Sequence, residues 1–191
     1  MKFYRPLPLD TELKISPSSL LISKTDLKGN YIYMNKHLCK ISAYEADELE
    51  NAPHNLLRHP DMPRAIFFKL WKELKEGNSV TILIKNLAKT GSFFWIKTEF
   101  STVQNIDSDP NVKYIAKGEM ATRKSIEQVE ILYAKLLKIE KRESMSASIL
   151  YLDHYLKERD VSFQEYMNRL LKPQTVMSSF FNKIKNGIRA A

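Results

Sequence analysis

The amino-acid sequence predicts an α+β domain followed by a region made of helices alone. Two observations lead to this prediction. Short apolar segments with a period of two, which is typical of strands, lie on both sides of a group of short helical segments. After Met120 the apolar period changes to about 3.6, the repeat of an α-helix. We therefore expect an antiparallel five-stranded sheet with short helices on one face, and a C-terminal helical region after it.

The composition is that of a folded protein with an excess of basic residues. The 191 residues are 43% hydrophobic and 27% charged, with a formal net charge of +8. Lysines and arginines are mixed with acidic residues, and we find no recognition helix, zinc-ligand spacing or RNA-binding aromatic motif, so we expect no nucleic-acid partner. The single cysteine, Cys39, fits a reducing cytoplasm. No apolar run has the length of a membrane span, so we expect a cytoplasmic protein that is at most peripheral to the membrane.

The first elements are an arm and a hairpin. Residues 1–19 contain three prolines and no clear period, and we expect an irregular N-terminal arm that covers an edge or a groove of the next domain. Residues 20–25 and 31–35 read as two strands. Gly29 and Asn30 between them are able to take a positive φ, which predicts a tight turn.

Residues 20–120 are predicted to form one domain. After the hairpin come two short helical pieces and a longer helix over 64–76, with a cavity expected between these helices and the sheet. The other predicted strands are residues 80–86, 92–100 and 112–117.

Residues 121–191 are predicted to be helices for dimerisation or for docking on a partner. Ser125 with Gln128, and Ser162 with Glu165, have the spacing of capping boxes at the starts of two helices. A last amphipathic helix is expected over 175–188, after a stop at Pro173.

The segment His54–Pro63 has the sequence HNLLRHPDMP and is the candidate for a polar pocket wall. Its two prolines disfavour a continuous helix, so we expect Arg58, His59 and Asp61 to project from a loop. Arginine can grip an anion with two hydrogen bonds, histidine titrates near neutral pH, and aspartate accepts hydrogen bonds. The alternative is a solvated loop whose charges pair with one another.

Several segments together resemble the PAS domains of bacterial aerotaxis and energy-taxis receptors. The HNLLRHPDMP run is the most specific of them, because most PAS domains lack it. The other matching segments are SKTDLKG (23–29), YMN (33–35), LWKELK (70–75), IKN (84–86) and FWIK (94–97).

The resemblance implies that FAD binds non-covalently between the sheet and the helices, held in part by Arg58, His59 and Asp61. The positions of three further residues match pocket residues of the family, namely Asn35, Trp71 and Asn86. An indole face can stack on a flat ring, and amides can pair with its polar edge.

The chain departs from the family pattern in two ways. It has no Trp near Val80, and no Gly near Ile82 on a strand that faces the expected cavity. It also lacks the membrane anchor and signalling hairpin of typical aerotaxis receptors. It therefore looks like the separate cytoplasmic sensor subunit of a two-protein energy-taxis receptor, whose partner is a membrane-bound methyl-accepting chemotaxis-type protein. A homodimer is also expected.

Three other readings stay open. A haem-binding gas sensor would need an axial histidine, for which His54, His59 or His37 is available. A PAS adaptor without any cofactor would only dimerise and bind receptors. A flavin-dependent oxidoreductase would need a second substrate domain or a nicotinamide fingerprint, and neither is visible, so we expect no enzyme activity.

Overall fold

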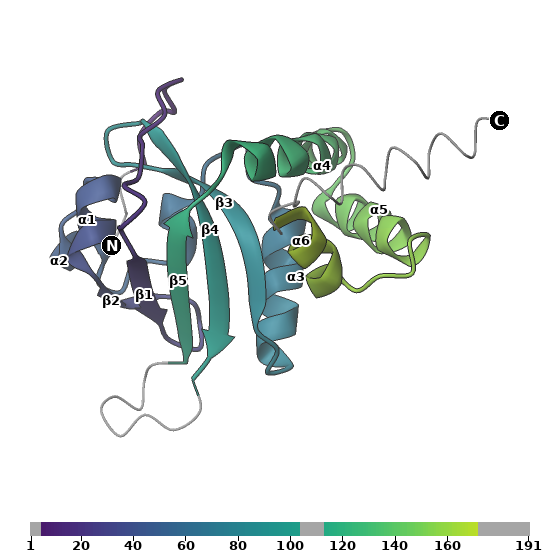
Figure 1. The fold of residues 1–191 in the computed structure, drawn as a ribbon, viewed down its shortest axis with the longest axis horizontal. Helices are drawn as coiled ribbons and strands as arrows, with labels where there is room; N and C mark the ends of the chain where they lie inside the picture. The colour runs from purple at the N-terminus through teal and green to yellow at the C-terminus, as the bar shows by residue number, and fades with distance from the viewer. Residues whose placement is uncertain (1–4, 104–112, 172–191) are drawn as a thin grey trace.

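The computed structural model describes residues 5–103 and 113–171, and its centre is one antiparallel sheet (Figure 1). The strand order is β2-β1-β5-β4-β3, which places the first hairpin at one edge and β3 at the other. The predicted α+β architecture with a five-stranded sheet is confirmed. The strands are β1 (Leu21–Thr25), β2 (Tyr31–Met34), β3 (Val80–Leu87), β4 (Phe93–Thr102) and β5 (Tyr114–Met120).

The predicted hairpin forms because Asp26 and Gly29 make its turn. The Asp26 carboxylate accepts from the backbone N–H groups of Lys28 and Asn30, both at 2.8 Å. Gly29 adopts a φ of 81°, which costs a glycine little. A Cβ atom at Gly29 would lie 3.3 Å from the Trp71 ring, so this position also lets the indole approach the turn.

Short helices cover the inner face of the sheet, as the sequence predicted (Figure 1). The segment expected to be a loop begins with one turn of 3₁₀-helix, η1, and only Arg58–Pro63 is irregular. Pro53 is the N-cap of this turn. Its ring fixes its φ at −68°, and its extended backbone is the conformation usual for the residue before a helix. The helices of this half are α1 (Lys36–Ser42), α2 (Ala46–Leu49), η1 (His54–Leu57) and α3 (Arg64–Lys75).

Three C-terminal helices lie together beyond edge strand β3: α4 (Arg123–Arg142), α5 (Met145–Lys157) and α6 (Phe163–Leu171) (Figure 1). The Tyr133 hydroxyl donates to the Leu83 carbonyl at 2.8 Å, and the Gln164 amide donates to the Ser79 carbonyl at 2.6 Å. An unpaired strand edge invites association with other chains, and here helices cover it. Buried residues of all three helices belong to the same hydrophobic core as the sheet.

One of the two predicted capping boxes is wrong. Helix α4 begins earlier than expected, because Thr122 is its N-cap and accepts from the Ser125 N–H at 3.2 Å. The other is confirmed, since Ser162 and Glu165 exchange hydrogen bonds at the start of α6. Pro173 and the helix expected over 175–188 lie outside the described residues.

The described part of the N-terminal arm, residues 5–19, runs against the turn between β3 and β4. Leu9 N–H donates to the Gly91 carbonyl at 2.8 Å, and Leu13 N–H donates to the Phe93 carbonyl at 2.7 Å. Ile15 is buried in the core. The arm thus packs on the domain, while the domain limits drawn from the sequence stay predictions.

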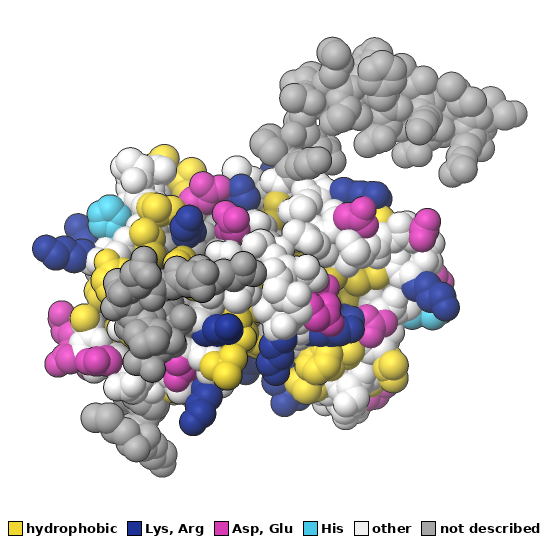
Figure 2. All heavy atoms as spheres, turned by 90° about the horizontal axis from the view of Figure 1, so that it is seen from below, with side chains coloured by type: hydrophobic (Ala, Val, Ile, Leu, Met, Phe, Trp, Pro, Cys, Tyr) yellow, Lys and Arg dark blue, Asp and Glu magenta, His cyan; other side chains and the backbone are white. Residues whose placement is uncertain are grey.

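Charged side chains of both signs are interspersed on the face shown in Figure 2. The excess of basic residues is therefore not gathered into one patch there. Within residues 5–103 and 113–171, no helix combines the length and the apolar character that crossing a membrane requires.

Candidate functional site

A small polar cavity lies between the sheet and the helices, and we call it the inner cavity. Strands β1, β3 and β4 each place one polar side chain on their inner face, at Ser23, Asn86 and Thr98, all of them buried. His54 from η1 closes the cavity on the helix side. The rest of the wall is mainly apolar, so these polar groups are gathered in one small space.

The inner cavity measures about 20 Å³, which is roughly the space of one water molecule. Cavities that hold drug-sized ligands measure ~300–1,000 Å³. The chemistry of the donor set fits the polar edge of a flavin ring, because Asn86 offers a donor and an acceptor and Thr98 a hydroxyl. The volume does not fit a tricyclic ring in this conformation, so a guest of that size requires side chains to move.

A second space opens on the other side of His54, and we call it the outer hollow. It measures about 240 Å³ and lies between the hairpin turn, η1 and α3. Arg58 and Trp71 line it, together with Lys28 and Phe67. Burial and the nearby guanidinium of Arg5 lower the pKa of Arg58, but a guanidinium remains charged at neutral pH.

Two buried polar atoms have no hydrogen-bond partner within the described ranges, and they belong to residues that line these two spaces. They are the hydroxyl oxygen of Thr98, a residue of the inner cavity, and Nε of Arg58, a residue of the outer hollow. A buried polar group without a partner costs ~1–3 kcal/mol. Such atoms are therefore candidates for contact with a guest.

The irregular segment Arg58–Pro63, which we call the signature loop, points its other side chains elsewhere. His59 is 4% exposed and packs on the Phe93 ring, with 5.8 Å between ring centroids. Its Nδ1 accepts from the Asp61 N–H at 3.1 Å, so the proton of the neutral ring lies on Nε2. The side chain expected to project from the loop is instead buried beneath it, because its ring nitrogen closes the turn.

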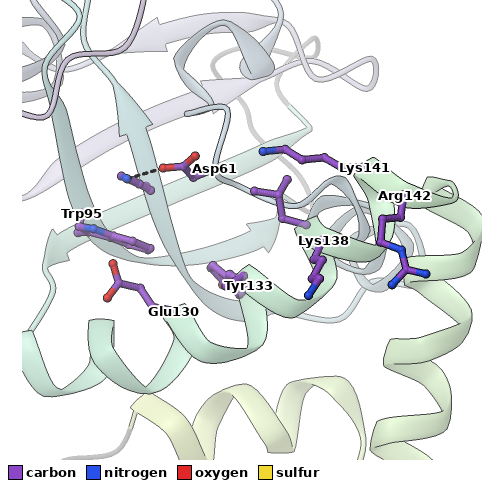
Figure 3. A pocket seen from close by; sticks show the side chains of 10 residues that line it. Asp61, Trp95, Glu130, Tyr133, Lys138, Lys141 and Arg142 are labelled. Carbon is purple, nitrogen blue, oxygen red and sulfur yellow. Dashed lines mark hydrogen bonds and ion pairs between the residues drawn. The ribbon is translucent and has the colours of Figure 1, made fainter.

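Asp61 faces a groove between helix α4 and the outer face of the sheet, which we call the α4 groove (Figure 3). Its carboxylate pairs with the Lys85 ammonium at 2.7 Å. Burial raises the pKa of Asp61, but the Lys85 hydrogen bond and charge outweigh it and hold the pKa below the usual value. Figure 3 shows Lys141 reaching toward Asp61, while Trp95 and Tyr133 form the floor.

Asn35 is fully used by the backbone around it. Its Oδ1 accepts from the N–H groups of Leu38 and Ile22, both at 3.1 Å, and its Nδ2 donates to the Leu20 carbonyl at 2.8 Å. It thus caps α1 and fastens that helix to β1. This side chain does not line the inner cavity or the outer hollow.

The six residues implied by the resemblance therefore separate into different places. Asn86 lines the inner cavity, while Arg58 and Trp71 line the outer hollow. His59, Asp61 and Asn35 line neither, and the role of all six in holding a cofactor stays a prediction. The chain from 5 to 103 and 113 to 171 contains no group of three or more His, Cys, Asp or Glu residues arranged to hold a metal ion.

Sequence reasoning missed Ser23 and Thr98, and it named His54 as a candidate axial ligand of a haem. A signal exists for Thr98, because it is a polar residue between Ile96 and Phe100 on the inward face of its strand. Ser23 has the apolar Leu21 on one side but the polar Thr25 on the other. His54 gives no such signal, since its surroundings depend on rings brought together from three other elements, β2, α3 and β4.

Helix α4 holds the start of α3, directly after the signature loop. Pro63 is the N-cap of α3 and has no side-chain acceptor for the free N–H groups of the first turn. Glu140, whose side chain is 5% exposed, supplies it: one carboxylate oxygen accepts from the Ala65 N–H at 2.8 Å, and the other lies 3.4 Å from Arg64 Nε. The loop and the C-terminal helices are therefore joined.

Acidification is expected to destabilise the fold through two histidines whose rings folding largely removes from water, His54 and His59. Burial lowers the pKa of His54 to about 4, and burial together with Lys85 lowers the pKa of His59 to about 4. The unfolded chain takes up these protons near pH ~6.5, before the folded chain does, so stability falls as pH decreases from ~6.5 toward 4. His54 alone contributes a loss of about 2 kcal/mol at pH 5.

Urea unfolding measured between pH 7.5 and pH 5 checks this expectation. Replacing His54 by Phe should remove the His54 part of the loss. Carboxylates with a lowered pKa act mainly below this range, because their ordinary values are about 4. An unfolding free energy that is equal at both ends of the range would contradict the assignment of neutral, buried rings.

Comparison with known proteins shows what this chain is similar to. Residues 31–115 match the family described as PAS fold. The aerotaxis receptor of Escherichia coli (strain K12) is 33% identical over 122 residues, which is 64% of this chain and 24% of the receptor. The chain thus spans about a quarter of the length of this relative.

Two solved structures show similarity at lower identity. The PAS domain of a protein from Colwellia psychrerythraea is 22% identical with a TM-score of 0.47, covering 55% of this chain and 87% of that one. A structure described in a study of a flavin analogue and the mechanism of light-oxygen-voltage domains is 21% identical with a TM-score of 0.47, covering 65% and 87%. The sequence match over residues 31–115, the five-stranded sheet and the helices on its inner face show a PAS fold in this chain, and the chain is similar in sequence to part of an aerotaxis receptor.

Proposed function

We propose that this chain is a redox or energy sensor that binds FAD non-covalently and signals to a separate chemoreceptor. The observation that carries the proposal is the pair of buried, unpartnered polar atoms of Thr98 and Arg58 on either side of His54. A bound flavin would supply reversible electron and proton uptake. Asn86 and Thr98 would hold the polar edge of its ring, and Arg58 its anionic part.

The route from this site to the surface runs through the signature loop. His59 N–H donates to the Lys85 carbonyl at 3.1 Å, and Arg58 bridges to Asn86, so the loop follows any displacement of this end of β3. The loop leads into α3, whose first turn is held by Glu140 of α4. A change at Asn86 would thus reach the C-terminal helices, which we propose as the surface for a membrane-bound, methyl-accepting chemotaxis-type partner in the cytoplasm.

The absorption spectrum of the purified protein, before and after incubation with FAD, tests the proposal. Bound flavin absorbs blue light, and a Soret band would instead indicate haem, with His54 the histidine at the cavity. Steady NAD(P)H consumption would favour an enzyme over a sensor. A pull-down with membrane receptors of the same cell, from extracts in which the flavin state is set beforehand, tests the partner.

Arg58→Ala is expected to weaken FAD binding at least about tenfold, because a charge-assisted hydrogen bond to an anion is lost. Equilibrium titration by flavin fluorescence measures this. Arg123→Ala is the matched control, since Arg123 is an exposed arginine that pairs with Glu12 and Glu127. Asp61→Ala belongs in the same series, because it tests the remaining implied role of that residue. Full FAD binding by the Arg58 variant would contradict the assignment.

A cofactor-free adaptor is the second candidate, and the size of the inner cavity favours it. At about 20 Å³ the cavity is already filled by the side chains of the protein. An adaptor would remain colourless after incubation with FAD, FMN or haem and would still be retained by a receptor. That combination of results would replace the sensor proposal by this one.

A further inference from the structure

His54 is the wall between the inner cavity and the outer hollow. It is the residue that the linings of the two spaces have in common. The inner cavity lies toward the sheet, with Thr98 and Asn86, and the outer hollow lies toward solvent, with Arg58 and Lys28. Anything that passes from the surface to the polar groups of the sheet at this point must therefore pass the imidazole ring.

Ring packing alone holds the His54 side chain. The ring contacts four aromatic residues, Tyr31, Trp71, Phe100 and Phe67, at centroid distances of 5.3, 5.9, 5.7 and 6.1 Å. Within the described part of the chain, neither ring nitrogen makes a hydrogen bond. The His54 side chain is half-buried, and no hydrogen bond from the described residues fixes it in this closed position.

The backbone of His54 is fixed while its side chain has space to turn. Pro53 precedes it, and its N–H donates to the Gly29 carbonyl at 2.9 Å. A rotation about χ1 moves the ring to another staggered position without breaking that bond. The outer hollow beside it, at about 240 Å³, offers volume on the side away from the sheet.

The two spaces differ in charge, and this difference indicates the kind of guest. The inner cavity holds neutral polar groups and apolar walls, which suit a flat heteroaromatic ring. The outer hollow is lined by two cationic side chains, Arg58 and Lys28, and within the described residues Arg58 Nε is buried without a hydrogen-bond partner. A guest with a neutral ring and an anionic tail would satisfy both ends at once.

We propose that His54 is the plug of a two-chamber site, in which the ring of a guest lies behind His54 and its anionic tail lies outside, on Arg58 and Lys28. The choice of a flavin as the guest rests on the function proposed above. The plug itself does not, because it follows from the position of one ring between two spaces.

Stopped-flow association of three flavins tests the plug. Lumiflavin has no tail, riboflavin has a neutral tail, and FMN has a phosphate. His54→Ala is expected to associate with all three at least about tenfold faster than the unaltered protein, which corresponds to ~1.4 kcal/mol in the barrier. His54→Phe, which keeps a larger plug in place, is expected to associate more slowly. Equal rates in all three proteins would overturn the proposal.

Leu56→Ala is the matched control for the loss of a buried side chain in the same 3₁₀ turn. Leu56 is buried but lines neither chamber, so its truncation should lower stability and leave the association rates within about twofold. If His54→Ala does not fold, His54→Phe still tests the proposal, because a ring larger than imidazole at the same position must slow the entry of a ligand. A His54→Phe rate equal to that of the unaltered protein would overturn the proposal.

Lys28→Ala tests the outer chamber. It should weaken FMN binding and leave lumiflavin binding unchanged, since only FMN carries the anion. An equal effect on both ligands would overturn the placement of the tail.

The outcomes separate the two proposals. If the unaltered protein takes no flavin but His54→Ala takes lumiflavin, the proposed function fails and the plug stands. If the unaltered protein takes flavin at the rate of His54→Ala, the plug fails and the function stands. If neither protein takes lumiflavin, no ring space lies behind His54 and both proposals fail.

Discussion

A chain that ends at Met120 is expected to lose its stable fold. The C-terminal helices cover the edge of β3 and apolar side chains of the sheet, which the PAS domain alone would leave exposed. Tyr133 bonds the Leu83 carbonyl on edge strand β3 and stacks on Trp95, with ring centroids 6.4 Å apart. Both Leu83 and Trp95 are buried. Each fully buried large apolar side chain contributes roughly 1.5–3 kcal/mol, so exposing several of them removes about 5 kcal/mol or more.

Such a loss is a large share of the ~5–15 kcal/mol that stabilises a typical domain. Thermal unfolding followed by circular dichroism should show a fall in Tm of at least roughly 10–20 °C, together with binding of a hydrophobic dye. A chain that ends at Leu171 keeps every contact described here and is the control. If the chain ending at Met120 melts at the temperature of the control, the helices are a separate docking module, as the sequence predicted, and not part of the core.

Replacing Glu140 by Ala should cost about 3 kcal/mol of stability. The substitution leaves the buried Ala65 N–H without an acceptor and removes the anion at the positive end of the α3 dipole. It also removes the carboxylate nearest to Arg64. Because Glu140 joins α4 to the segment after the signature loop, we further expect the variant to bind FAD and yet lose its redox-dependent binding to the receptor.

Glu140→Gln is the control for charge, since the amide oxygen still accepts from Ala65. It should recover more than half of the lost stability, because the hydrogen bond contributes more than the helix dipole at this buried position. Urea unfolding at pH 7.5 measures both variants. An alanine variant as stable as the unaltered protein would mean that water replaces the carboxylate. The contact between Glu140 and the start of α3 would then contribute nothing to the free energy of unfolding.

Much of the fold could be predicted from sequence because its signals are local. The hairpin follows from Asp26 and Gly29, which determine the turn within five residues. Helix α3 follows from its apolar spacing and from Gly77, whose φ of 85° ends it. The HNLLRHPDMP segment indicated the resemblance for the same reason, since its ten residues are contiguous and can be recognised without knowledge of their tertiary contacts.

The arrangement of the site could not be predicted, because it depends on contacts between distant residues. Glu140 meets Ala65 across 75 positions, and Tyr133 meets Leu83 across 50. His59 was expected to project from the loop, but its ring nitrogen closes the turn of its own loop and draws it inward. The size of the inner cavity depends on how far neighbouring side chains fill it, and no residue pattern reports that volume.

The two lateral borders of the sheet have a consequence for how two copies of this chain can meet. At the β3 border, helices bond the carbonyls of Leu83 and Ser79. At the β2 border, Tyr31 is bonded in both directions by the segment before η1, accepting from Asn51 N–H at 2.9 Å and donating to the Ala52 carbonyl at 2.8 Å. With these main-chain groups taken, both borders of the sheet are partly closed to pairing with a strand of another molecule. Two copies of this chain would then associate through side-chain contacts between their surfaces, and single substitutions can change the strength of such contacts.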